Sequence, residues 1–344
     1  MLEAPGHETG HAGHLADAFT WREYVHGLRT EHGGWKALAT ALQDRAEDEV
    51  AEDPDSVVKG LKRLARNRQR PGGKYGDLLL RLFGLSSSIE QWGRLLGQYH
   101  SRFADLPVGL RREQLLRWDR PPVSETPSAM WVHIGLASLA HRDRDLVEVR
   151  RRVALASGVP RPEPGAKLEL ALLQARLASD DGDLETEDQA LRRVHSLLTD
   201  EGPDALCYQA RYRDQLAYRA SRDWRTRPAA LREALAHYEA IPAGDVPPFV
   251  AFRRAVGRAW CLWRLGEVAQ AAELAALAAQ HAGDGAFIRL RVMALSLQAN
   301  IAGDTPHGRA LHVRAVRLSA GLDDADLAAR VASHPPGSAT PSTP

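Results

Sequence analysis

Residues 262–278 read LWRLGEVAQAAELAALA, and this stretch decides the fold class. The pair Leu265-Gly266 predicts the end of one helix, because glycine readily adopts the backbone conformation with which helices terminate. The small residues that follow, up to Ala278, predict a second helix that can pack closely against the first. The stretch therefore predicts a pair of helices joined by a short break.

Breaks of the same kind recur along the chain, near residues 141, 180, 222, 265 and 302. The steps between them are 39, 42, 43 and 37 residues. Such spacing is typical of helix-pair repeats. One pair cannot bury its apolar face alone, so we expect neighbouring pairs to stack into a superhelix. A plain all-α bundle is the alternative.

The composition agrees with a soluble, helical protein. Hydrophobic residues make up 44% of the chain and aromatic residues 6%, while Ala, Leu and Arg dominate. This composition argues against a β-sandwich or barrel. No apolar run approaches the length of a transmembrane helix and no signal peptide is visible, so we expect a cytoplasmic location and no membrane. Two cysteines give no disulfide framework.

The repeat units resemble the tetratricopeptide repeat family. Its units carry a Leu-Gly pair and a small residue twelve positions after the glycine, which Leu265, Gly266 and Ala278 match. Ala269 stands where the family has an aromatic residue, and the spacing exceeds the family's repeat of about 34 residues. The resemblance extends over residues 128–320 and implies an α-solenoid of helix pairs.

Breaks in the helical pattern predict the domain organisation. Residues 1–18 are rich in Gly and His and predict a flexible arm. We expect a small helical domain over 19–120, a Pro-rich linker over 121–127 and the repeats over 128–334. The low-complexity residues 335–344 predict a disordered tail.

The near-neutral total charge of +1 conceals two opposite segments. Residues 1–58 carry 4 basic and 12 acidic groups, whereas residues 59–120 carry 14 basic and 5 acidic groups. Residues 121–344 carry 27 of each. The sum therefore reflects cancellation, and it does not exclude a polyanionic partner.

The basic segment is densest from residue 59 to residue 74. Asp53 is suited to cap a helix here, and Pro54 to occupy its first turn. Helical spacing then places Val57, Leu61 and Leu64 on one side and four cations on the other. The candidate nucleic-acid-binding residues are Lys59, Lys62, Arg63, Arg66, Arg68, Arg70 and Lys74.

Three helices are expected between residues 35 and 84, and the middle one is cationic. They resemble a helix-turn-helix domain, in which the second motif helix lies in the major groove. About ten residues, many of them acidic, replace the tight turn of that family. Two other interpretations stay open: a solvated surface that pairs with the adjacent acidic run, and a docking face for an acidic protein.

The expected first helices of the repeat pairs carry aromatic and arginine side chains, which suit a groove that holds a peptide. The candidate groove residues are Tyr208, Arg211, Tyr212, Arg219, Arg253 and Trp260. At helical spacing the aromatic residues also fit a hydrophobic core, and the arginines a solvated surface.

The chain offers no catalytic site that we defend. His7-Glu8-Thr9-Gly10-His11 matches the zincin pattern, but no scaffold precedes it, so we expect neither a catalytic metal nor a cofactor. A His-rich arm that binds metal adventitiously is the alternative. The order of domains resembles bacterial regulators that join a helix-turn-helix domain to tetratricopeptide-type repeats. That resemblance implies a DNA-binding regulator with a protein or peptide partner, or a homodimer. The alternative is a non-catalytic adaptor without nucleic-acid binding.

Overall fold

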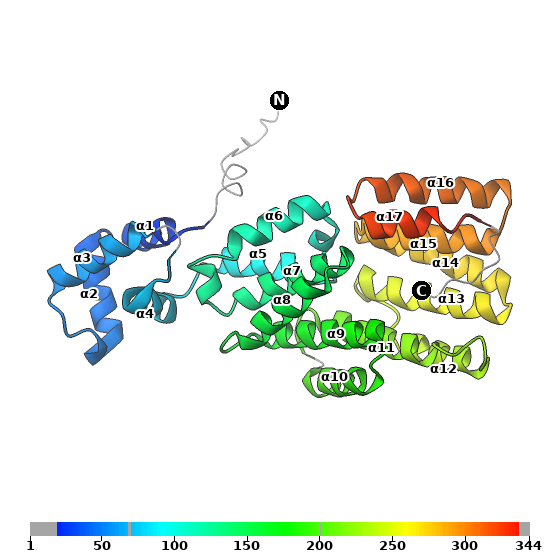
Figure 1. Ribbon diagram of the computed structural model, residues 1–344, viewed down its shortest axis with the longest axis horizontal. Helices are drawn as coiled ribbons and strands as arrows, with labels where there is room; N and C mark the ends of the chain where they lie inside the picture. The colour runs from blue at the N-terminus through cyan, green and yellow to red at the C-terminus, as the bar shows by residue number, and fades with distance from the viewer. Residues whose placement is uncertain (1–18, 68–69, 200, 337–344) are drawn as a thin grey trace, which may run out of the picture. The chain divides into compact units, whose positions relative to one another are not determined.

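A computed structural model of the chain describes residues 19–67, 70–199 and 201–336. These residues form seventeen α-helices, three short 3-10 helices and no β-strand (Figure 1), so the predicted all-α class is confirmed. The predicted arm over 1–18 lies outside the described residues, as does the tail from residue 337. No helix of the described part is long and apolar enough to cross a lipid bilayer.

The chain divides into two compact units. The first comprises Met1–Gln91 and Gln114–Ala129, and the second comprises Trp92–Glu113 and Met130–Pro344. The Pro-rich segment 121–127 falls within the first unit, where Glu125 accepts a hydrogen bond from the Gly72 N–H at 3.1 Å.

Four helices form the body of the first unit, and parts of two more belong to it. They are α1 (Trp21–Glu31), α2 (Trp35–Ala46), α3 (Pro54–Ala65) and α4 (Gly73–Phe83), with parts of α5 (Ser87–Gly97) and α6 (Val108–Trp118). Each of the three helices expected between residues 35 and 84 is present. Their core is built on Trp21, which is fully buried, and on leucines from α2, α3 and α4.

The second unit contains the repeat pairs. Its helices are α7 (Ala129–Arg142), α8 (Leu146–Gly158), α9 (Pro164–Asp181), α10 (Leu184–Leu197), α11 (Ala205–Ala220), α12 (Ala229–Glu239), α13 (Pro248–Leu265), α14 (Val268–Asp284), α15 (Ile288–Ala302), α16 (Pro306–Ala320) and α17 (Ala325–Ala332). From α9 onward each helix packs on its successor in the chain, and pair follows pair in Figure 1. The predicted breaks coincide with the ends of α7, α9, α11, α13 and α15. The prediction of an α-solenoid of helix pairs is confirmed.

The stretch that decides the fold class behaves as its residue types predict. Gly266 adopts a left-handed backbone (φ +92°) and its N–H bonds back to carbonyls at the end of α13. Ala271, Ala275 and Ala278 of α14 are fully buried. Their small side chains allow α14 to approach α13 closely, which explains why a run of alanines forms a stable pair.

Candidate nucleic-acid interface

Helix α3 begins and ends as its sequence predicts. The Asp53 carboxylate caps it by accepting a hydrogen bond from the Ser56 N–H at 3.0 Å. Hydrogen bonding to the Ser56 side chain, and then to its backbone, lowers the pKa of Asp53. Pro54 occupies the first turn, where a missing N–H costs nothing. Val57, Leu61 and Leu64 face the core of the first unit. One side of the helix is thereby fixed, and the opposite side is directed to solvent.

The solvent side of α3 is cationic. Lys59, Lys62, Arg63 and Arg66 are all exposed, and Arg70 is exposed in the turn that follows. Among the described residues, no carboxylate lies within ion-pair distance of Lys59, Arg63, Arg66 or Arg70. Arg68, the remaining candidate of this turn, lies outside the described residues. Four exposed cations of this surface thus have no carboxylate partner in the part of their unit that the structure describes.

Two glutamates of the acidic run between α2 and α3 form ion pairs with α4. Glu52 binds Lys74 at 2.7 Å, and Glu49 binds Arg81 in a two-bond contact. These hydrogen bonds lower the pKa of both carboxyl groups. The cations that neutralise these two glutamates therefore belong to α4 and not to α3. Of the six candidates that the structure describes, Lys74 is the one engaged in an ion pair.

The turn after α3 is held by contacts that involve its backbone. The Trp21 indole N–H donates to the Arg70 carbonyl at 3.2 Å, and the Asn67 amide donates to the carbonyls of Arg70 and Pro71. Gly72 lies so close to Trp21 that a Cβ there would come within 2.3 Å of the ring. The close approach requires glycine at position 72. The contacts of Trp21 with Gly72 and with the Arg70 carbonyl fix the position of the Arg70 backbone.

Three of the predicted groove residues are buried and hold a segment of their own chain. Tyr208, Arg211 and Arg253 surround residues 98–100, which follow α5. The Gln98 amide donates to the Tyr208 hydroxyl at 3.3 Å, and the Arg253 guanidinium donates to the Tyr99 hydroxyl at 2.7 Å. Arg211 lies over the Tyr99 ring, 4.8 Å from its centroid. These three side chains are therefore buried against a segment of their own chain and are not exposed for a partner from another molecule.

Carboxylates neutralise both buried arginines. Arg211 binds Glu169 at 2.5 Å, and Arg253 binds Asp214 at 3.1 Å. Burial alone would raise the pKa of the Tyr99 hydroxyl, but the positive charges around it, above all Arg253, hold that pKa below its usual value. The network joins α9, α11 and α13 to residues 98–100. The sequence of residues 98–100 does not predict these contacts, because the partner residues lie about 70 to 155 positions away in the chain.

The other three predicted groove residues do not reach this segment. Tyr212 stacks on His195, Arg219 pairs with Asp188 at 2.7 Å, and Trp260 makes an edge contact with Trp224. The six residues therefore do not form one continuous groove. The binding of a protein or peptide partner by the second unit stays a prediction.

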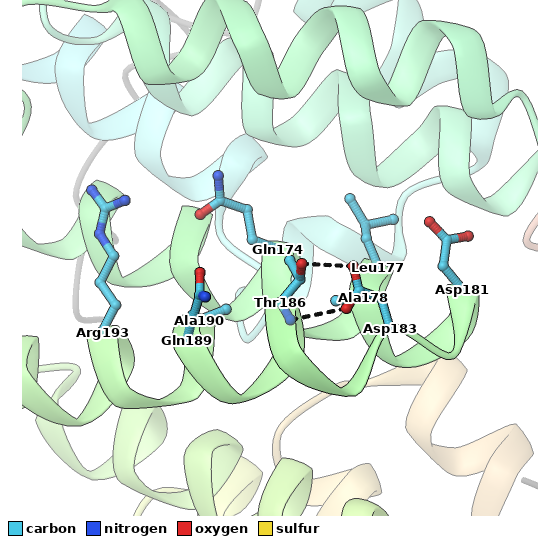
Figure 2. Close-up of a pocket in the computed structure, with 9 residues that line it drawn as sticks. All are labelled: Gln174, Leu177, Ala178, Asp181, Asp183, Thr186, Gln189, Ala190 and Arg193. Carbon is cyan, nitrogen blue, oxygen red and sulfur yellow. Dashed lines mark hydrogen bonds between the residues drawn. The ribbon is translucent and has the colours of Figure 1, made fainter.

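A depression of about 400 Å³ lies between α9 and α10 (Figure 2). Asp181 and Arg193 are at its opposite ends in this view, and Asp183 uses its carboxylate to cap α10 through Thr186. This lining offers no acid–base pair. Cys207 and Cys261 are buried, and burial raises the pKa of each thiol to about 12, so both are poor nucleophiles. The described residues contain no group of ligands that could hold a metal ion, and His7, His11 and His14 lie outside them.

Comparison of the chain with protein-family models, curated proteins and solved structures finds no match.

Proposed function

We propose that the protein binds DNA through the exposed face of α3 and acts as a DNA-binding transcription regulator in the bacterial cytoplasm. The observation that carries the proposal is the set of four exposed cations, Lys59, Arg63, Arg66 and Arg70, without carboxylate partners among the described residues. Unpaired cations on a rigid helix can displace the counterions condensed on a phosphate backbone, which is the main source of affinity for nucleic acid.

Two further features support this function. The order of α2 and α3, followed by a fixed turn, resembles a helix-turn-helix domain, and the stacked pairs of the second unit resemble tetratricopeptide-type repeats. In this proposal α3 provides the DNA contact, and the repeat unit provides the contact with a protein partner or a second copy. The two buried free thiols fit a reducing compartment.

Fluorescence anisotropy of the full chain with a 30-base-pair duplex tests the proposal. The quantity to measure is the slope of log affinity against log salt concentration, called the salt slope below. The four cations of α3 and its following turn should contribute about −3.6 to this slope, because each phosphate contact contributes about −0.9. We expect the double variant Arg63→Glu/Arg66→Glu to lose more than about tenfold in affinity at low salt.

A matched control is available on α16. Arg314 and Arg317 have the same three-residue spacing, are exposed and make no ion pair among the described residues. Arg314→Glu/Arg317→Glu should leave DNA affinity unchanged. Equal losses in both variants would indicate non-specific charge effects, and no loss in the α3 variant would contradict the proposal. Binding of polyglutamate but not of DNA would favour the adaptor with an acidic protein partner.

A further inference from the structure

A half-buried tryptophan brings cations from two helices together in the first unit. Trp35 opens α2, and the Lys62 ammonium of α3 lies 5.9 Å from the centroid of its ring. The Arg29 guanidinium of α1 lies 5.6 Å from the same ring. His26, also of α1, makes an edge contact at 5.4 Å. Trp35 thus joins the cationic face of α3 to α1.

Helix α1 has a cationic face of its own. Arg22, His26 and Arg29 follow one another at four and three residues, so they share one side of the helix. The adjacent side of the helix is buried through Trp21, Val25 and Leu28. In the described part of the chain, none of the three cationic residues forms an ion pair. The charge count of residues 1–58 hides this face, because the acidic groups of that segment outnumber the basic ones.

The two carboxylates of α1 are directed elsewhere. Glu23 accepts from the Thr20 N–H at 2.7 Å in a capping box, and Glu31 lies nine residues after Arg22, on the other side of the helix. The pKa of His26 is lowered, first by partial burial and then by the charges of Arg29 and Arg22. A lowered pKa favours the neutral imidazole, so Arg22 and Arg29 carry the positive charge of this face.

We propose that α1 forms a second part of the polyanion-binding surface, with Arg22 and Arg29 contacting phosphates and Trp35 positioning Arg29 and Lys62. This inference rests on the proposed function, because it assigns the same ligand class to a wider surface. A phosphate backbone presents charges at regular intervals, and two cationic helix faces joined at Trp35 can bind successive phosphates. A cation–π contact restricts the long side chains of Arg29 and Lys62 before binding, which reduces the entropy lost on contact.

The test measures the salt slope with the same 30-base-pair duplex for neutral variants of the full chain. Arg22→Gln/Arg29→Gln removes two phosphate contacts, so we expect the slope to become less steep by about 1.8. Trp35→Leu removes no charge. We expect it to weaken binding severalfold while the slope stays the same, a combination that simple loss of cations would not produce.

Arg45→Gln is the matched control. Arg45 is an exposed cation of the same unit that also lies over an aromatic ring, that of Phe83, but on α2 and away from Trp35. Its removal should leave the slope unchanged, and circular dichroism checks that each variant folds. An unchanged slope in Arg22→Gln/Arg29→Gln, together with a reduced slope in Arg63→Gln/Arg66→Gln, would overturn the inference and leave the proposed function standing. The absence of DNA binding by the unaltered chain would overturn both.

Discussion

Arginines of α3 and arginines of α11 and α13 occupy opposite environments. Arg63 and Arg66 of α3 are exposed, and no carboxylate pairs with them among the described residues. Arg211 and Arg253 of the second unit are buried at 7% and 6% exposure, and each is bound to a carboxylate. The same residue type on an amphipathic helix is therefore a surface cation in one unit and part of the interior in the other.

This comparison shows that an arginine is tied to the fold where a buried carboxylate pairs with it, and is free to bind a ligand where none does. Burying a charge costs several kcal/mol unless an opposite charge and hydrogen bonds compensate. In the second unit that compensation comes from Glu169 and Asp214, so the arginines there are tied to the fold. On α3 no such compensation is needed, because the cations stay hydrated until a polyanion replaces the water.

The largest effect is expected from Glu169→Gln. Glu169 is 2% exposed, and its removal leaves the buried Arg211 guanidinium without its counter-charge. Breaking one partner of a buried ion pair typically costs about 3–5 kcal/mol. Urea unfolding followed by circular dichroism should show that loss in the free energy of unfolding.

The matched change in the first unit is Arg63→Gln, which removes an exposed and unpaired cation. We expect its free energy of unfolding to differ from that of the unaltered chain by less than about 0.5 kcal/mol. Similar losses in the two variants would break the contrast between the units.

The next largest loss of stability is expected from Gly→Ala substitution at one of two glycines that face tyrosine rings. A Cβ at Gly257 would lie 2.1 Å from ring atoms of Tyr238, and a Cβ at Gly60 would lie 2.2 Å from those of Tyr75. Tyr238 is buried, whereas Tyr75 is half-buried and can rotate toward solvent. Gly257→Ala should therefore cost about 1–3 kcal/mol by overpacking.

Gly60→Ala should be closer to neutral, because alanine favours the helix by about 1 kcal/mol and offsets the displacement of Tyr75. Thermal unfolding of both variants measures the difference. A larger loss at Gly60 would mean that the first unit is packed as tightly as the repeat pairs, contrary to the expected order.

Local signals in the sequence were sufficient for the helices and insufficient for their partners. The Leu265-Gly266 pair, the Asp53 cap and the alternation of apolar and basic residues on α3 each act within a few residues, and the structure reproduces them. The pairing of Glu52 with Lys74, 22 residues apart, depends on how helices pack.

The contacts of Tyr99 show the same limit more clearly. Tyr99 meets Arg253 across 154 positions of the chain, and no pattern in the sequence connects the two. The cationic face of α1 was overlooked for a different reason: net charge over a segment averages opposite faces of the same helix.

The smallest effect on stability is expected from Glu52→Gln, which removes the carboxylate that holds Lys74. The side chains of Glu52 and Lys74 are 38% and 51% exposed, and ion pairs open to solvent in this way contribute little to folding. The melting temperature should therefore stay within experimental error. The affinity for DNA should rise, because Glu52→Gln releases Lys74 and removes one negative charge beside the α3 surface. If Lys74 then contacts a phosphate, the affinity rises and the salt slope steepens by about 0.9.

Glu49→Gln is the control for this prediction, since Glu49 holds Arg81 of α4, which is not among the candidate DNA contacts. It removes the same charge from the same acidic run, so a difference between the two variants isolates the released Lys74. A lower melting temperature without any change in DNA binding would give Glu52 and Lys74 the structural role of the buried pairs. The Glu52–Lys74 pair would then stabilise the fold, as the buried ion pairs of the second unit do. The polyanion-binding surface would consist of the unpaired cations of α1 and α3 without Lys74.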